Sequence, residues 1–386
     1  MSTDFLHLTD FYSEEQKMIK KATADFVNSK ILPTIEKDFA NEHFPKTRFS
    51  ALGDLGVLGP FVEKMYGGID ADYITYGIIM QELEKGDSGL RSAASVQGSL
   101  VMYPIWAYGT EEQKEKYLPK LASGEWVGCF GLTEPNFGSN PNGMQTRLSK
   151  KNNHFVLNGT KLWITNAPFA DIAIVWAKND EGHIVGLLVE KDMKGFTTTT
   201  IHNKWSLRAS HTGELVFDNV IIPNSHILPQ AQGLSAPLKC LDSARYGIAW
   251  GVIGAAIACY ETAVKYSKER IQFGKPIGGF QLTQQKLADM LTAITQAQLL
   301  AYRIGQLKNE GTATSTQISM AKRSNVAMAL KIARDSRQIL GAMGVTSDFP
   351  IMRHMLNLES VVTYEGTNEI HTLILGKHIT GISAFQ

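Results

Sequence analysis

A single carboxylate near the end of the chain lies in a setting that favours acid–base chemistry. Glu365 stands in the stretch VVTYEGTNEIH, directly after a run of β-branched and apolar residues. A charged side chain beside apolar groups is costly unless it is paired, solvated or used chemically. Partial removal from water raises the pKa of a carboxylate, which makes it a better general base near neutral pH. A solvated turn, in which Gly366 simply ends a helix, is the alternative that these residues leave open.

A second stretch, CFGLTEPNFGSN, combines hydrogen-bonding residues with glycines. Thr133, Gly138 and Ser139 could donate backbone or hydroxyl hydrogen bonds to an anionic or carbonyl-bearing ligand. An ordinary loop rich in proline, glycine and asparagine has the same composition, and this stretch alone favours the loop.

Aromatic and basic residues mark two further stretches. LWITNA offers an aromatic wall at Trp163 and a hydroxyl at Thr165, although a buried strand would have the same pattern. In RIQFGKPI, the guanidinium of Arg270 suits a pyrophosphate through bidentate contacts. A solvated arginine at a helix end is commoner, so neither stretch decides alone between a binding site and ordinary structure.

Composition excludes several classes of protein. The 386 residues favour two or three packed domains, and 44% hydrophobic with 19% charged residues fits a soluble globular protein. A net charge of +1 points to neither nucleic acid nor an anionic membrane. The three cysteines, Cys129, Cys240 and Cys259, have no CxxC spacing, which argues against zinc or disulfides and fits a reducing compartment. The ten histidines are scattered and form no metal-ligand cluster.

The N-terminus and the longest apolar stretch predict a cytoplasmic protein. MSTDFLHLTDFYSEEQ contains neither a secretory signal nor an Arg-rich presequence. The mitochondrial matrix is the expectation only for the processed form of a eukaryotic protein. The stretch YGIAWGVIGAAIACY, at 246–260, is too short to span a bilayer and predicts a buried core helix.

The first two thirds of the chain change from helical to strand-like patterns. Capping boxes at Ser13 and Thr110 open helices in the first third. Strand-like runs begin at about Gly128, namely HFVLNGTKLWIT, DIAIVWAK, HIVGLLVEK and GELVFDNVIIP. Within the first run, Asn158-Gly159 predicts the tight turn of a β-hairpin.

The last part of the chain is helical again, which sets the fold class. Its periodicity predicts long helices over 238–270, 281–309 and 316–342. Helices, then strands, then helices indicate an α+β protein. The predicted domains are a helical domain at 1–127, a β domain at 128–233 and a helical domain at 234–386. No GxGxxG follows a strand and no GxxxxGK[ST] occurs, so neither a Rossmann site nor a P-loop is predicted.

Six long motifs run through the chain: GLRSAASVQGSLVM, GCFGLTEPNFGSN, LDSARYGIAWGV, QLTQQKLADMLTAIT, RHMLNLESVVTYEGT and LILGKHITGISAF. Between Phe11 and Phe385 the chain resembles the acyl-CoA dehydrogenase flavoprotein family, and within it most of all the glutaryl-CoA dehydrogenases. The resemblance implies an N-terminal helical domain, a middle β-barrel or sandwich and a C-terminal four-helix domain. It also implies an FAD-dependent oxidoreductase that assembles as a homotetramer, with FAD at subunit contacts.

The resemblance assigns cofactor-binding positions motif by motif. Those that line the flavin and its ribityl-phosphate arm correspond to Phe130, Leu132, Thr133, Gly138, Ser139, Trp163 and Thr165. Those that reach the FAD of a neighbouring subunit correspond to Arg270, Gln281, Gln338 and Gly341. Thr367 corresponds to a position near the adenosine diphosphate portion, and Phe273 is a further cofactor-binding position. Two positions depart from the family pattern: Asn140 stands where aspartate is usual, and Ala342 where a second glycine is frequent. We expect local retuning of the loop rather than loss of FAD.

The resemblance also assigns the substrate side of the site. Glu365 is the base that removes the α-proton of an acyl thioester, while a hydride passes from the β-carbon to the flavin. A tunnel for plain acyl chains should be apolar at its end, so Arg91 suits the terminal carboxylate of glutaryl-CoA and Glu84 is expected to orient it. The other substrate positions are Ser92, Ser139, Arg245, Tyr246, Tyr364 and Gly366.

The expected reaction is the oxidative decarboxylation of glutaryl-CoA to crotonyl-CoA and carbon dioxide, in lysine and tryptophan degradation, with an electron-transfer flavoprotein as acceptor. Three alternatives stay open at this point. The first is a short-chain acyl-CoA dehydrogenase or oxidase, and the second a glutaryl-CoA dehydrogenase that does not decarboxylate. The third is a non-catalytic protein that binds flavin or acyl-CoA.

Overall fold

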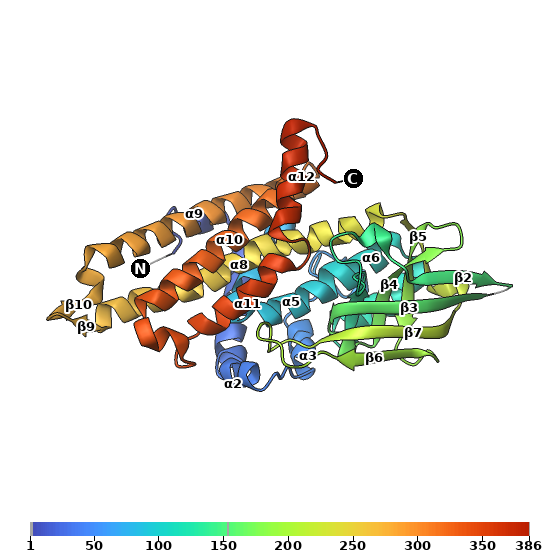
Figure 1. The fold of residues 1–386 in the computed structure, drawn as a ribbon, viewed down its shortest axis with the longest axis horizontal. Coiled ribbons are helices and arrows are strands. Elements are labelled where there is room, and N and C mark those ends of the chain that lie inside the picture. Colours follow the sequence, from blue (N-terminus) through green and yellow to red (C-terminus); the bar gives the residue numbers. More distant parts are fainter. Residues whose placement is uncertain (1–2, 153, 386) are drawn as a thin grey trace.

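The computed structural model of the chain describes residues 3–152 and 154–385. The chain forms helices first, then a sheet, then helices again, which confirms the predicted α+β class. Figure 1 shows the sheet at one end of the molecule, with the long C-terminal helices running from it to the opposite end.

The first part of the chain is helical, and two of its helices begin at the capping boxes that the sequence predicts. Ser13 and Gln16 form the expected capping box, as do Thr110 and Gln113, so each box satisfies two backbone N–H groups at a helix start. The α-helices of this part are α1 (Glu14–Phe26), α2 (Ile35–Ala40), α3 (Thr47–Asp54), α4 (Tyr73–Gly86), α5 (Ser88–Ser95), α6 (Tyr103–Tyr108) and α7 (Glu111–Ala122). A π-helical turn, η4 (Val96–Met102), continues α5 into α6.

The middle of the chain forms one mixed sheet. Its strands are β1 (Gly128–Gly131), β2 (Arg147–Lys151), β3 (His154–Thr165), β4 (Ile172–Asn179), β5 (Ile184–Glu190), β6 (Phe196–Thr200), β7 (Thr212–Ile222) and β8 (Ile227–Gln232). The strand order is β6-β7-β3-β2-β4-β5-β8, and β1 pairs in parallel with β4.

The hairpin predicted at Asn158-Gly159 is wrong, because β3 runs straight through these residues. Pairing continues with β7 on both sides of a register shift between Leu157 and Gly159. The Asn158 side chain accepts a hydrogen bond from the backbone N–H of Asn219 at 2.8 Å. The Asn-Gly pair therefore lies inside a long strand, opposite a β-bulge at Asp218-Asn219 of β7, rather than in a turn between two short strands.

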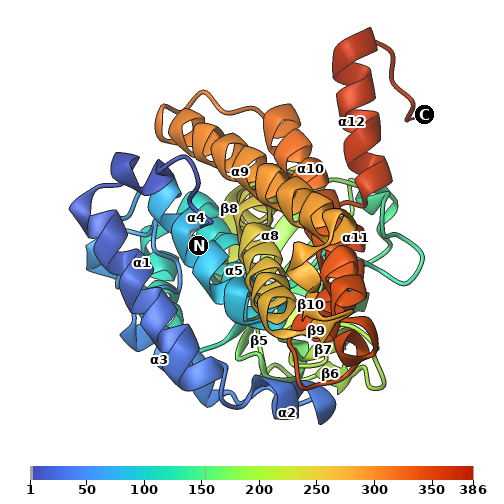
Figure 2. The same ribbon diagram turned by 90° about the vertical axis from the view of Figure 1, so that its left-hand side faces the viewer.

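The last part of the chain packs its helices against the first. Its elements are α8 (Ser235–Glu269), β9 (Ile271–Gln272), β10 (Lys275–Pro276), α9 (Gln281–Asn309), α10 (Ser315–Ile339), α11 (Ile351–Thr363) and α12 (Asn368–Thr380). The three predicted long helices are confirmed, although α10 ends three residues early and a 3₁₀ segment, η9 (Gly341–Val345), follows. Figure 2 shows α12 standing away from the other helices.

Helix α8 is the central element of the helical core. It packs along α4 and α10. Gly77 on α4 permits this, because a Cβ there would lie 2.4 Å from the indole of Trp250. By length and composition α8 could cross a membrane. However, 78% of its most apolar 18-residue segment is buried inside the structure, as in the core helix of a soluble protein. The prediction of a buried core helix at 246–260 is confirmed.

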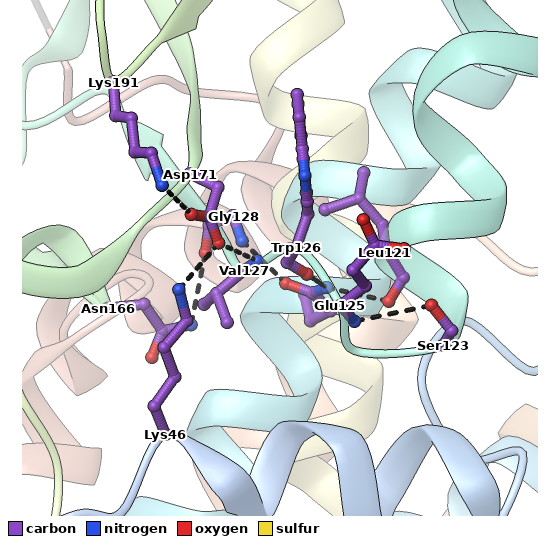
Figure 3. A network of polar contacts seen from close by, with 11 residues as sticks. Lys46, Leu121, Ser123, Glu125, Trp126, Val127, Gly128, Asn166, Asp171 and Lys191 are labelled. Atoms are coloured by element: carbon purple, nitrogen blue, oxygen red, sulfur yellow. Dashed lines mark hydrogen bonds and ion pairs between the residues drawn. The ribbon is translucent and has the colours of Figure 1, made fainter.

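A polar network around the buried side chain of Asp171 joins the first helical part to the sheet, as Figure 3 shows. Asp171, at the start of β4, accepts hydrogen bonds from the ammonium groups of Lys46 and Lys191 and from the backbone N–H of Val127. Gln97, on η4, accepts from the N–H of Gly128 at 2.8 Å and donates to two carbonyls near the end of α7. These contacts fix β1 against the helices that carry the candidate site.

Candidate active site

Glu365 lies in the short connection between α11 and α12. Its φ of +52° is in the left-handed region, which a residue with a side chain seldom occupies outside functional or tightly constrained positions. Gly366 follows with a φ of +95°, and a Cβ there would lie 2.9 Å from the ring of His371. Glycine at 366 therefore lets the connection turn tightly against α12.

Two buried cations hold the carbonyls of this connection. Lys322 donates to the carbonyl of Tyr364 at 3.0 Å and to that of Gly366 at 2.7 Å. Arg245 Nε donates to the carbonyl of Glu365 at 2.8 Å. With the carbonyls turned toward the cations, the backbone N–H of Glu365 makes no backbone hydrogen bond to any described residue. That N–H is available to a ligand oxygen.

The environment of the Glu365 carboxylate suits a general base. Oε2 is buried and has no hydrogen-bond partner among the described residues. Burial raises the pKa of Glu365 above its ordinary value, while the nearby charges of Arg91, Arg245 and Lys322 oppose that rise. A carboxylate kept ionised by cations, yet poorly solvated, accepts a proton more readily than one in water. This geometry favours the base over the solvated turn.

Arg91 is fully buried on α5, and it lies near enough to Glu365 for its charge to lower the pKa of that carboxyl. Its Nε donates to Glu84 Oε2, on α4, at 2.7 Å, as the sequence leads us to expect. Its Nη2 donates to the hydroxyl of Tyr364. Its Nη1 is buried with no partner among the described residues. A buried arginine with one orphaned nitrogen fits a pocket that receives an anionic group.

The other substrate-side positions fall in different surroundings. Ser92 is buried beside Arg91 on α5, whereas Ser139 is exposed in the loop after β1. Tyr246 is buried on α8, and its hydroxyl donates to the carbonyl of Tyr73 at 2.7 Å. Its hydroxyl is therefore occupied by the protein, and the ring forms part of the wall between α4 and α8.

The predicted positions that line the flavin and its ribityl-phosphate arm form a first set, which lies where β1 and β3 end. Phe130 and Leu132 are buried, while Thr133 and Thr165 are partly exposed. Trp163 is 59% exposed and has a φ of +63° at a register shift of β3, so its indole faces outward from the sheet. A Cβ at Gly138 would meet no atom within 4 Å, so the loop is open there.

A buried ion pair holds this region in place. Lys161 donates to Glu134 at 2.8 Å and to the carbonyl of Leu132 at 3.1 Å. Glu134 also accepts from the backbone N–H groups of Gln145 and Thr146, which closes the loop between β1 and β2. An exposed indole beside hydroxyls and backbone groups fits a ligand that combines an aromatic ring bearing carbonyl oxygens with a phosphate-bearing arm, as FAD does.

The second set of predicted cofactor positions lies at the far end of the molecule. It comprises Arg270, Phe273, Gln281, Gln338 and Gly341, on the exposed surface around β9, β10, α9 and the end of α10. Phe273 is 93% exposed. Figure 1 shows β9 and β10 at the end opposite to the sheet, and 35 residues of α8 span roughly 50 Å. One copy of the chain does not bring the two sets together.

Thr367 lies apart from both sets, next to Glu365. It is the N-cap of α12, and its hydroxyl accepts a hydrogen bond from the N–H of Ile370. The two departures from the family pattern, Asn140 and Ala342, are both exposed, one in the loop after β1 and one in η9.

Family models match almost the whole chain. The N-terminal, middle and C-terminal domains of acyl-CoA dehydrogenase match residues 13–125, 129–220 and 231–380. The chain belongs to the acyl-CoA dehydrogenase family. The predictions of this family and of its fold are thereby confirmed. The prediction of FAD as the cofactor is confirmed by a family member solved with FADH2, described next.

Individual acyl-CoA dehydrogenases are similar over their full length. A crystal structure of glutaryl-CoA dehydrogenase from Mycobacterium smegmatis is 48% identical, with a TM-score of 0.98 over 100% of both chains. A second structure from that organism, a glutaryl-CoA dehydrogenase in complex with FADH2, is 47% identical, with a TM-score of 0.98 over 100% of this chain and 99% of the other. The short-chain-specific acyl-CoA dehydrogenase of Megasphaera elsdenii is 36% identical over 379 residues, which are 96% of this chain and 98% of that protein.

The structure adds residues to this acyl-CoA dehydrogenase site that sequence reasoning missed. Lys322, Lys161 and Glu134 are buried and each holds backbone of a predicted site loop. A signal for Lys322 was present, because it stands on the apolar face of α10 with Ile318 and Asn325 at helical spacing. A lysine at a core position of an amphipathic helix indicates a buried partner.

Proposed function

We propose that the chain is a glutaryl-CoA dehydrogenase, which oxidises and decarboxylates glutaryl-CoA to crotonyl-CoA and carbon dioxide. The observation that carries this proposal is Arg91, fully buried with Nη1 unpartnered near the proposed base. Desolvating a guanidinium is costly unless its donors are satisfied. A carboxylate at the end of a C5 acyl chain satisfies Nη1, whereas the methyl end of a butyryl chain leaves it orphaned.

The existing partners of Arg91 leave room for this role. Glu84 accepts from Nε, so it fixes the plane of the guanidinium without covering Nη1. Tyr364 binds Nη2 through its hydroxyl, and its ring lies 5.7 Å from the guanidinium carbon. The arginine is thus preorganised for a carboxylate rather than free to move, which favours specificity.

The chain's own residues perform the first half of the reaction around the thioester. Glu365 removes the α-proton, and the free N–H of Glu365 donates to the thioester oxygen on which negative charge develops. Gly366 permits the acyl group to approach the backbone closely. Trp163, Thr165 and the loop after β1 would hold FAD, which when bound accepts the hydride that leaves the β-carbon.

The same base serves the second half of the reaction. After oxidation the new double bond is conjugated with the thioester, so the bond between the γ-carbon and the carboxylate can break with its electron pair delocalised as a dienolate. Carbon dioxide leaves, and the proton that Glu365 gained returns to the γ-carbon. Tyr364 and Glu84 both accept hydrogen bonds from Arg91, the proposed partner of the distal carboxylate, and this arrangement supports the decarboxylating outcome.

Product analysis tests the decarboxylation directly. With glutaryl-CoA and an artificial electron acceptor, we expect crotonyl-CoA and carbon dioxide in equal amounts, measured by mass spectrometry and carbon dioxide release. Glutaconyl-CoA that accumulates without carbon dioxide would show oxidation without decarboxylation, and that part of the proposal would be wrong.

A short-chain acyl-CoA dehydrogenase is the second candidate. The 36% identity to the short-chain-specific enzyme of Megasphaera elsdenii favours it. The buried, partly unpaired Arg91 argues against it, because a tunnel for butyryl groups has no anion to pair with this cation.

Assembly, acceptor and location complete the proposal. The two sets of predicted cofactor positions lie at opposite ends of one copy, which supports a homotetramer that builds each FAD site from two subunits. We also propose an electron-transfer flavoprotein as the electron acceptor and a cytoplasmic location.

A further inference from the structure

Lys322 occupies a place in the site that the proposed reaction does not use. It stands on α10 and is fully buried. Its ammonium donates to the carbonyls of Tyr364 and Gly366, which flank Glu365, and forms no ion pair with a carboxylate among the described residues. A buried ammonium without an acidic partner is costly, so its position needs a compensating role.

The contacts of Lys322 join those of Arg245 into one clamp. Lys322 holds the carbonyls on either side of the base, and Arg245 holds the carbonyl of the base itself. Together they fix three successive carbonyls at residues 364–366. A connection in the left-handed region persists only when its surroundings determine it, and these hydrogen bonds supply that constraint.

We propose that Lys322 is a positioning residue, whose ammonium holds the 364–366 connection so that the Glu365 carboxylate and N–H face the acyl group. The inference rests on the proposed function, in which Glu365 is the base. It assigns Lys322 no contact with the substrate; Lys322 acts through the backbone on both sides of Glu365.

The charge of Lys322 also bears on the protonation of the base. Burial lowers the pKa of Lys322 to about 7, while the charge of Glu365 raises it. In return the ammonium lowers the pKa of Glu365. The other titratable or charged groups that face Lys322 come from α5, α8, the connection and α12: Arg91, Arg245, Tyr364, Glu369 and His371. Burial and the charge of Lys322 keep His371 neutral, with a pKa of about 3.

Two substitutions separate the roles of the ammonium. Lys322→Met removes donors and charge, whereas Lys322→Gln keeps two N–H donors without the charge. The control is Lys331→Met on the same helix, where the lysine is exposed and pairs with Asp335. Each purified holoenzyme is compared with wild type for FAD content, acyl-CoA dissociation constant, exchange of substrate α-protons into D₂O, and amide hydrogen exchange of the peptide that covers 364–367.

We expect Lys322→Met to lower the rate of α-proton exchange by roughly 10- to 100-fold, because a small misplacement of a base has an effect of that size. FAD content and the acyl-CoA dissociation constant should stay within about twofold of wild type. The 364–367 amides should exchange faster. In both Lys322 variants, the acidic limb of the pH profile of α-proton exchange should move to higher pH. The pKa of Glu365 rises because the base has lost a neighbouring positive charge.

The outcomes distinguish this inference from the proposed function. If Glu365→Gln retains α-proton exchange, Glu365 is not the base and the proposed function fails. If Glu365→Gln abolishes exchange while the Lys322 variants keep the wild-type rate and acidic limb, only the inference about Lys322 is overturned. If Lys322→Met does not yield folded holoenzyme, Lys322→Gln decides by the same two readouts.

Discussion

Glu365→Gln should abolish turnover while the protein keeps its fold and its yellow cofactor. The amide is nearly the size of the carboxylate, and Oε2 makes no hydrogen bond that its loss would break. Loss of a positioned general base lowers the rate by a factor of roughly 10² to 10⁴, and by more where no other group can reach the proton. The measurement is steady-state turnover of glutaryl-CoA with an artificial acceptor, at saturating substrate.

The matched control is Glu369→Gln, an exposed glutamate four residues further along, at the start of α12. It should turn over at close to the wild-type rate. Turnover of Glu365→Gln within tenfold of wild type would remove Glu365 from the chemistry. The buried carboxylate would then be a structural feature of the connection.

Arg91→Gln should raise the barrier for glutaryl-CoA far more than that for butyryl-CoA. Only glutaryl-CoA loses a charge-assisted pair, and loss of one such partner in a desolvated site costs roughly 2–5 kcal/mol. That is roughly a 30- to 4,000-fold loss of kcat/KM. Parallel kinetics with the two substrates measure the difference, and butyryl-CoA serves as the internal control.

The single substitution also leaves Glu84 buried without its cation, which can lower the free energy of unfolding by about 3–5 kcal/mol. The double variant Arg91→Gln/Glu84→Gln removes both charges and separates the loss of folding from the loss of selectivity. Equal losses for both substrates, in the single and the double variant, would make Arg91 structural and would exclude it as the carboxylate-binding group.

The local parts of the fold could be predicted from the sequence, because their signals lie within a few residues. The capping box at Ser13 and the long helix 281–309 depend on neighbours along one helix, and both are confirmed. The bulge opposite Asn158-Gly159 could not be predicted, because it lies in β7, about 60 residues further along the chain, and depends on the pairing of β3 with β7. A local turn signal was overruled by a distant strand.

The candidate site shows the same division. Glu365 could be singled out because its apolar surroundings are adjacent in the sequence, and Arg91 because no other charged residue follows it before Glu111. The clamp by Lys322 could not be predicted, because its acceptors lie 42 and 44 residues away on another element. The separation of the two sets of cofactor positions likewise depends on the length and direction of α8, which only the folded chain shows.

The most direct test of the central claim is the anaerobic absorbance of the purified wild-type holoenzyme after addition of glutaryl-CoA or butyryl-CoA. We predict that glutaryl-CoA bleaches the oxidised flavin rapidly, while butyryl-CoA at the same concentration does so far more slowly. Bleaching by butyryl-CoA as fast as by glutaryl-CoA would contradict the assignment of Arg91 to substrate recognition and favour a short-chain enzyme. If neither thioester changes the absorbance, the proposed acyl-CoA dehydrogenase activity is contradicted. The chain would then be a protein that binds flavin without oxidising these thioesters.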